Sequence, residues 1–211
     1  MLLMDEPLSA LDARLRVEMR TEILRLHREI SATIIYVTHD QVEAMTMSTR
    51  VAVMDQGRAL QVAPPRELFR RPADMTVATF IGTPAMNIIP ATVVTTTSGL
   101  SIELLGRQIP VAPRHYVALQ GLRRVEVGIR PQALRLAVPG PDRITGRVFL
   151  REPLGLEDEV LVETGNGLRV KVVTAASEDF PEGAVAGLEF GMADLVLFQP
   201  ESNATLCFGN D

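Results

Sequence analysis

The pattern of apolar residues changes near residue 88, and this change most constrains how the chain can fold. Residues 1–87 alternate between helix-like segments and short β-branched, apolar runs, which predicts an α/β part with a parallel sheet and flanking helices. Residues 88–211 contain short β-rich runs broken by Gly and Pro at spacings of about ten residues. Such runs are typical of a small barrel or sandwich. We therefore expect two domains, 1–87 and 88–211.

Two segments define the expected α/β part. Apolar residues recur every three or four positions from Asp12 to Ile30, which predicts an amphipathic helix with Asp12 as its N-cap. The run from Thr33 to Thr38 is β-branched and apolar without polar alternation, so it predicts a strand buried on both faces of a parallel sheet. At the other end of the chain, residues 201–211 are expected to form a loose tail.

Two adjacent carboxylates come at the end of the first apolar run. Leu2 to Asp5 is typical of a buried strand end, Glu6 follows it directly, and His39 comes just after the strand at 33–38. Since the carboxyl ends of parallel strands lie at one edge of a sheet, we expect these three side chains to lie there together. One carboxylate can hold Mg²⁺ at nucleotide phosphates, the next can polarise water, and an imidazole can hydrogen-bond a phosphate. The alternative is a strand that ends in solvated acids, followed by a structural histidine.

The sequence around these residues resembles the ATP-binding-cassette (ABC) transporter ATPases of the maltose and glycerol-phosphate importer type. Two stretches carry the resemblance, LLMDEPLSALDARLRVEMRTEILRLH and TIIYVTHDQVEAMTMSTRVAVMDQGRALQVAPPRELFRRPADMTVATFIGTPAMN. The resemblance implies a Walker B strand in which Asp5 is the Mg²⁺ residue and Glu6 is the catalytic base. It also implies that His39 senses the γ-phosphate of ATP. The D-loop, which crosses a dimer interface in the family, would be formed by Ser9, Ala10, Leu11 and Asp12.

The β-rich part resembles the regulatory domain of these ATPases, an oligonucleotide-binding-type (OB) β fold. This resemblance is carried by GIRPQAL, at Gly128 to Leu134, and REPLGLEDEVLVE, at Arg151 to Glu163; Gln132 stands where the family commonly has Glu. The family resemblance implies a peripheral protein on the cytoplasmic face of a bacterial-type membrane, which hydrolyses ATP with Mg²⁺ to import sugars or related solutes. Its partners would be a second ATPase subunit, membrane-spanning permease subunits and, indirectly, a solute-binding protein.

Two motifs of the family are missing from these 211 residues. There is no G-x-x-x-x-G-K-[ST] phosphate loop, and Lys171, the only lysine, lies in LRVKVV without a glycine loop. The L-S-G-G-Q signature is missing as well. We therefore expect the C-terminal portion of a longer ATPase, inactive by itself. The alternative is a non-catalytic regulatory or dimerising β module that retains a vestigial ATPase remnant.

Composition argues against other classes of protein. The net charge of −5 and the aromatic content of 4% disfavour nucleic-acid binding, the role that an OB-type fold alone would suggest. No apolar run approaches the roughly 20 residues that span a bilayer. The single cysteine, Cys207, cannot form an internal disulfide, which fits a reducing compartment.

Overall fold

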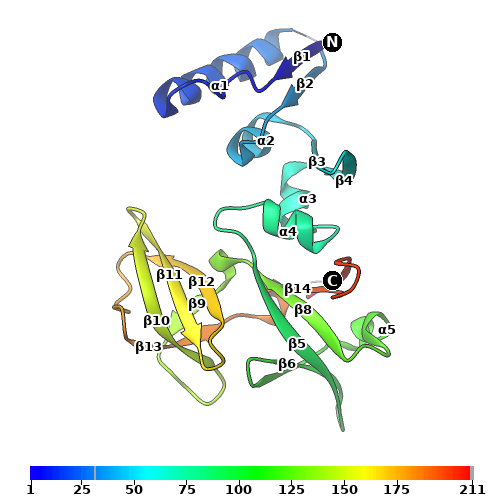
Figure 1. Cartoon of the computed structure of the whole chain (residues 1–211), viewed down its shortest axis with the longest axis vertical. Coiled ribbons are helices and arrows are strands. Elements are labelled where there is room, and N and C mark those ends of the chain that lie inside the picture. Colours follow the sequence, from blue (N-terminus) through cyan, green and yellow to red (C-terminus); the bar gives the residue numbers. More distant parts are fainter. Residues whose placement is uncertain (31, 210–211) are drawn as a thin grey trace. The chain divides into compact units, whose positions relative to one another are not determined.

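The computed structural model describes residues 1–30 and 32–209, and the contacts within it divide the chain into two compact units. We call Met1–Arg71 the first unit and Pro72–Asp211 the second unit. Figure 1 shows the helices and strands of both units, coloured along the sequence from the N-terminus to the C-terminus. Each unit is described by itself below.

The first unit begins with a short parallel sheet joined by a helix. Strands β1 (Leu2–Asp5) and β2 (Ile34–Val37) pair in parallel, and α1 (Ala13–Glu29) connects them. The Asp12 carboxylate accepts hydrogen bonds from two backbone N–H groups in the first turn of α1, so the expected helix and its N-cap are confirmed. The remaining elements are α2 (Gln41–Met47), the antiparallel hairpin of β3 (Val51–Asp55) and β4 (Arg58–Ala63), and α3 (Pro65–Arg70).

The parallel sheet lacks the two buried faces that the sequence predicted. Ile35 and Val37 of β2 are 48% and 51% exposed, and Leu3 of β1 is 66% exposed. Leu15 and Met19 on the apolar face of α1 are also more than a third exposed. Since this sheet has only two strands among the described residues, the expected α/β layer is present only as one strand–helix–strand unit, and the chain is mostly β.

The second unit contains two antiparallel sheets, as the β-rich sequence predicted. One sheet has the strand order β15-β14-β8-β5-β6-β7, and the other has the order β12-β11-β10-β13-β9. In Figure 1, β5, β6 and β8 of the first sheet are green, β10, β11 and β12 of the second sheet are yellow to orange, and β14 of the first sheet is orange. Their bounds are β5 (Asn87–Thr96), β6 (Gly99–Leu104), β7 (Arg107–Pro110), β8 (Arg124–Ile129), β9 (Arg135–Ala137), β10 (Ile144–Pro153), β11 (Glu157–Thr164), β12 (Arg169–Ala175), β13 (Val185–Glu189), β14 (Leu195–Phe198) and β15 (Thr205–Phe208). Short helical turns are α5 (Tyr116–Leu119) and the 3₁₀ segments Pro113–His115, Pro131–Ala133 and Met192–Asp194.

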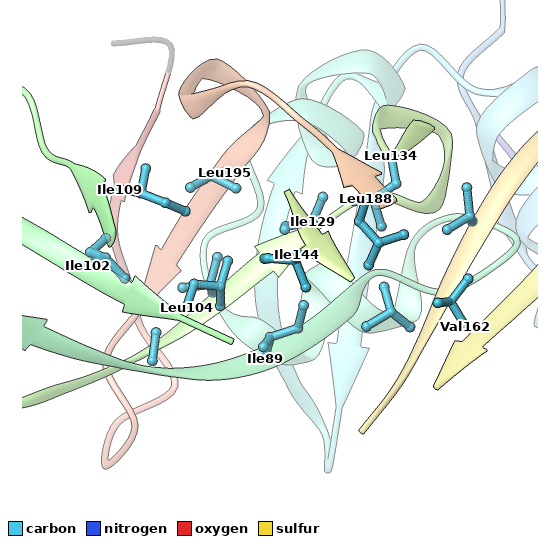
Figure 2. Close-up of a cluster of buried hydrophobic side chains, with 14 of the residues drawn as sticks. Ile89, Ile102, Leu104, Ile109, Ile129, Leu134, Ile144, Val162, Leu188 and Leu195 are labelled. Carbon is cyan, nitrogen blue, oxygen red and sulfur yellow. The ribbon is translucent and has the colours of Figure 1, made fainter. Parts of the chain in front are cut away.

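One continuous apolar core joins the two sheets of the second unit. Figure 2 shows side chains of both sheets in this core, among them Ile89 and Leu104 from the first sheet and Val162 and Leu188 from the second. Asn87 adds a polar link between the sheets, because its side-chain amide exchanges two 2.8 Å hydrogen bonds with the backbone of Lys171 on β12. The second unit is therefore one packed body.

Helix α4 (Met75–Phe80) belongs to the second unit. Ala78 of α4 packs in a buried apolar cluster with Met86, Val196 and Phe198. The buried Arg130 guanidinium donates hydrogen bonds to the carbonyls of Ala78 and Ile81 at the end of this helix. The compact units therefore divide at Arg71, before the boundary that the change of sequence pattern indicated near residue 88.

The expected loose tail is partly wrong. Thr205–Phe208 forms strand β15, which pairs antiparallel with β14. Cys207 on this strand is buried in the apolar core. The last two residues of the tail, 210–211, lie outside the described residues.

Candidate functional site

The carboxyl ends of β1 and β2 bring the acidic pair and the histidine to one edge of the parallel sheet. Asp5 lies opposite Val37 in the register of the two strands, and the Glu6 N–H donates a 2.9 Å hydrogen bond to the Val37 carbonyl. His39 follows two residues after Val37. The juxtaposition expected from the sequence is therefore present in the folded chain.

Glu6 and His39 contact each other directly. The Nδ1 atom of His39 lies 3.0 Å from Oε1 of Glu6, and the two side chains are 71% and 45% exposed. Glu6 has a φ of 44°, in the left-handed region that non-glycine residues rarely adopt. Such backbone strain tends to cluster at functional sites. The chain thus holds the Glu6 side chain at an accessible edge in an uncommon conformation.

The four residues predicted as a D-loop form a turn between β1 and α1. The Ser9 hydroxyl donates to the Glu6 carbonyl at 2.9 Å, and Asp12 caps α1. Ser9, Ala10 and Asp12 are exposed, and Leu11 is half-buried. Leu8, which directly precedes Ser9 in this turn, is buried and only 2% exposed. The segment is therefore anchored at Leu8 and accessible at its tip.

The Asp5 carboxylate lies at the strand end, where it is accessible to solvent. The part of the chain that the structure describes contains no group of three or more His, Cys, Asp or Glu side chains arranged to hold a metal ion. Mg²⁺ commonly takes only one or two protein carboxylates and completes its octahedron with water and substrate phosphates. A single Asp5 carboxylate therefore suits a Mg²⁺ that arrives with a nucleotide.

Three further residues hold the segments that carry this site, and the sequence analysis did not identify them. Glu43 is buried on α2, Asp40 caps α2, and Arg16 on α1 contacts both Asp40 and the Leu11 carbonyl. The D-x-x-E spacing from Asp40 to Glu43 is a helix-start signal that could have revealed the first two. No local pattern marks Arg16, because its partner Asp40 is distant in sequence.

The contact between His39 and Glu6 makes the stability of the first unit depend on pH. The hydrogen bond from the imidazole to Glu6, together with the Glu6 charge, raises the pKa of His39 above its usual 6.5. A raised pKa in the folded state means that the pair stabilises the first unit fully below the unfolded-state pKa, and this stabilisation is lost as pH rises through the folded-state pKa. Replacing Glu6 by Gln should move the pKa of His39 back toward its usual value.

A proton NMR titration of His39 in the wild-type chain and in Glu6→Gln measures this pKa directly. The ring signal of His27, which lies on the exposed surface of α1, serves as an internal control. An identical titration of His39 in the two proteins would show that the two side chains are not paired in solution.

Comparison with known protein families identifies two domains in the second unit. A TOBE domain family model matches residues 127–198, and a MalK OB fold domain model matches residues 82–134. Both matches lie within the second unit and overlap residues 88–211, for which the family resemblance implied an OB-type β fold. No helix in the described part of the chain is long and apolar enough to cross a membrane.

Similar full-length proteins are ABC transporter ATP-binding proteins. The chain is 42% identical over 204 residues to the uncharacterized ABC transporter ATP-binding protein y4oS of Sinorhizobium fredii, covering 97% of this chain and 53% of that protein. It is 38% identical over 207 residues to YcjV of Escherichia coli, covering 97% and 57%. With the maltose/maltodextrin import ATP-binding protein MalK of Salmonella typhi it shares 44% identity over 162 residues, covering 76% and 44%.

The chain thus spans about half the length of the relatives that it matches. The matches to y4oS and YcjV extend over both units, whereas the two domain models cover the second unit alone. The chain is therefore a homologue of the ABC transporter ATP-binding proteins, MalK among them, and its second unit carries their MalK OB fold and TOBE domains.

Proposed function

We propose that this chain is part of the ATP-hydrolysing subunit of an ABC importer, and that Asp5, Glu6 and His39 form the hydrolytic edge of its ATP site. The observation that carries the proposal is the 3.0 Å contact between His39 Nδ1 and Glu6 Oε1 at the carboxyl ends of two parallel strands. In open α/β sheets, ligands bind at such strand ends. The homology to ABC transporter ATP-binding proteins supports ATP as the ligand.

Each residue has a separate role in this proposal. Glu6 orients the attacking water and accepts its proton while the water oxygen attacks the γ-phosphorus of ATP, with ADP as the leaving group. His39 uses Nδ1 to bond Glu6, and we assign its Nε2 to a hydrogen bond with the terminal phosphate. Asp5 would hold Mg²⁺, which neutralises charge on the β- and γ-phosphates.

The proposed domain assignment follows the same homology. Residues 1–87 would be the C-terminal part of a P-loop ABC ATPase domain with an α/β fold, and residues 88–211 would be its regulatory domain. The accessible turn of Ser9 to Asp12 would be the D-loop that faces a second ATPase subunit. The matches of the OB fold and TOBE models to residues 82–134 and 127–198 support a regulatory role for the second part.

The proposed partners and cargo are those of a sugar importer. MalK, to which the chain is 44% identical, is named for maltose and maltodextrin import. We infer a second ATPase subunit, membrane-spanning permease subunits and, indirectly, a solute-binding protein as partners. The working site is the cytoplasmic face of the membrane, and the cargo is a sugar or a related solute.

A second candidate function is a regulatory or dimerising β module without catalysis. One observation favours it: the second unit has a continuous apolar core of its own. Under this alternative, Glu6 and His39 would be a remnant without turnover.

Experiments on a fusion protein distinguish between the two proposed functions. In the fusion, this chain replaces the segment of Salmonella typhi MalK that it matches, so that MalK supplies the remaining part of the protein. We expect the fusion to hydrolyse ATP, and His39→Ala to lower its kcat by about a hundredfold, the typical cost of removing one donor that stabilises transition-state charge.

His27→Ala is the matched control for this experiment, because His27 is an exposed histidine of the first unit on α1, away from the strand ends. It should leave kcat unchanged. A fusion that binds ATP but does not hydrolyse it would favour the non-catalytic alternative, and turnover that is insensitive to His39→Ala would contradict the role proposed for His39.

A further inference from the structure

A buried carboxylate lies beneath the loop that carries His39. Glu43 on α2 is only 3% exposed, and its Oε2 atom accepts hydrogen bonds from two hydroxyls, that of Tyr36 at 2.9 Å and that of Thr38 at 2.8 Å. Burial, reinforced by the neighbouring Glu43, raises the pKa of the Tyr36 hydroxyl, which therefore stays protonated and continues to donate. A buried charge with its hydrogen bonds satisfied costs much to disturb, so these contacts fix the geometry locally.

Glu43 is linked through Thr38 to the residues on both sides of His39. Thr38 precedes His39 and donates to Glu43, while the same Thr38 hydroxyl accepts a 2.9 Å hydrogen bond from the backbone N–H of Asp40, which follows His39. Asp40 in turn caps α2 through its Oδ1 atom, at 2.7 Å from the Val42 N–H. The loop is thus tied to α2 immediately before and immediately after the histidine.

Arg16 connects this loop to the turn that follows Glu6. Its Nη1 atom contacts Asp40 Oδ2 at 3.4 Å, and its Nη2 atom donates to the Leu11 carbonyl at 3.0 Å. Both ends of this ion pair are largely shielded from solvent, with side-chain exposures of 32% for Arg16 and 24% for Asp40. One guanidinium therefore spans the two segments that carry Glu6 and His39, and its planar fork favours a fixed spacing between them.

We propose that Glu43 and Arg16 are positioning residues that hold His39 at hydrogen-bond distance from Glu6. The significance of this inference rests on the proposed roles of Glu6 and His39 in hydrolysis. Without the Glu43 carboxylate, Thr38 loses its acceptor and the loop gains freedom. Without Arg16, the loop and the turn at Leu11 lose their shared contact. In either case His39 should spend less time against Glu6.

The tautomer of neutral His39 reports this contact without any need for catalysis. A bond from Nδ1–H to the Glu6 carboxylate favours the Nδ1–H form, since the partner of one ring nitrogen sets which nitrogen carries the proton. Proton–nitrogen correlation NMR of residues 1–211, at a pH where the ring is neutral, distinguishes the two forms. Glu6→Ala gives the reference spectrum for an unpaired His39.

We expect Glu43→Leu and Arg16→Ala to move the His39 signals toward this reference. Glu43→Gln is the conservative rescue, because both hydroxyls donate to a single oxygen that the Gln carbonyl can replace. Arg14→Ala is the control for Arg16→Ala, since Arg14 is an exposed arginine of the same helix that pairs with Glu18. Glu43→Gln and Arg14→Ala should both retain the wild-type tautomer of His39.

Wild-type His39 signals in folded Glu43→Leu and Arg16→Ala would overturn the inference. If Glu43→Leu unfolds the first unit, Thr38→Val tests the same link, because it removes the hydroxyl with little change of shape; an unchanged tautomer there also overturns it. ATP hydrolysis by the MalK fusion is measured separately. If the tautomer changes while kcat does not, the positioning role stands and the proposed role of His39 in hydrolysis fails.

Discussion

Replacing Glu6 by Gln in the fusion with MalK is expected to reduce ATP hydrolysis by about 10²–10⁴-fold, the contribution of a positioned general base. Gln keeps the size of the side chain but cannot accept the proton of the attacking water. The Asp5 carboxylate remains, so ATP binding with Mg²⁺ should be retained. The left-handed backbone at this position also tolerates Gln, since Gln56 of this chain adopts a φ of 46°. Single-turnover hydrolysis and equilibrium ATP binding measure the two quantities separately.

Glu18→Gln is the matched control for this substitution. Glu18 is an exposed glutamate on α1 that pairs with Arg14, outside the strand ends, and its replacement should leave turnover unchanged. Normal hydrolysis by the Glu6→Gln fusion would mean that another group accepts the proton. Loss of ATP binding together with turnover would mean that Glu6 acts in binding and not as the base.

Leu104→Ala is expected to lower the free energy of unfolding of the second unit by about 2–5 kcal/mol. Leu104 is fully buried on β6, in the core that joins the two sheets (Figure 2). Truncation removes apolar contacts and leaves a cavity that two hydrogen-bonded sheets cannot easily close. The loss is large beside the total of about 5–15 kcal/mol typical of a domain. Urea unfolding of residues 1–211, followed by the circular dichroism of the strands, measures it.

Leu156→Ala is the control for the core substitution. Leu156 lies in the turn between β10 and β11 and is 91% exposed, so its truncation should change stability by no more than about 0.5 kcal/mol. Equal effects of the two substitutions would contradict a continuous core between the sheets.

Local patterns were enough to predict part of the fold and of the candidate site. The helix α1 and its cap at Asp12 followed from the spacing of apolar residues, because one face of a helix repeats every three to four positions. The placement of Glu6 and His39 at one edge of the sheet followed from the rule that parallel strands share their carboxyl edge, whereas their direct contact is a finding of the structure. These features depend on short stretches of chain and on one topological rule.

Features that depend on distant contacts could not be predicted in this way. The strand at Thr205–Phe208 is fixed by its pairing with β14, and α4 joins the second unit through Met86 and Phe198. The exposed faces of β1 and β2 show the same limit. An apolar strand sequence indicates that the strand can be buried, but it does not show whether other elements pack against it. Arg16 bridges two segments that are far apart in sequence.

Calorimetric titration of residues 1–211 with MgATP tests most directly the claim that this chain carries only the acidic half of an ATP site. Tight nucleotide binding needs backbone N–H groups and a cation around the phosphates, and the only lysine, Lys171, lies in the second unit without a glycine loop. We predict binding no tighter than about millimolar, worth roughly 4 kcal/mol, and no ATPase activity of this chain alone. A micromolar, Mg²⁺-dependent signal that is lost in Asp5→Ala would contradict the claim, because it would mean that these residues build a complete phosphate site.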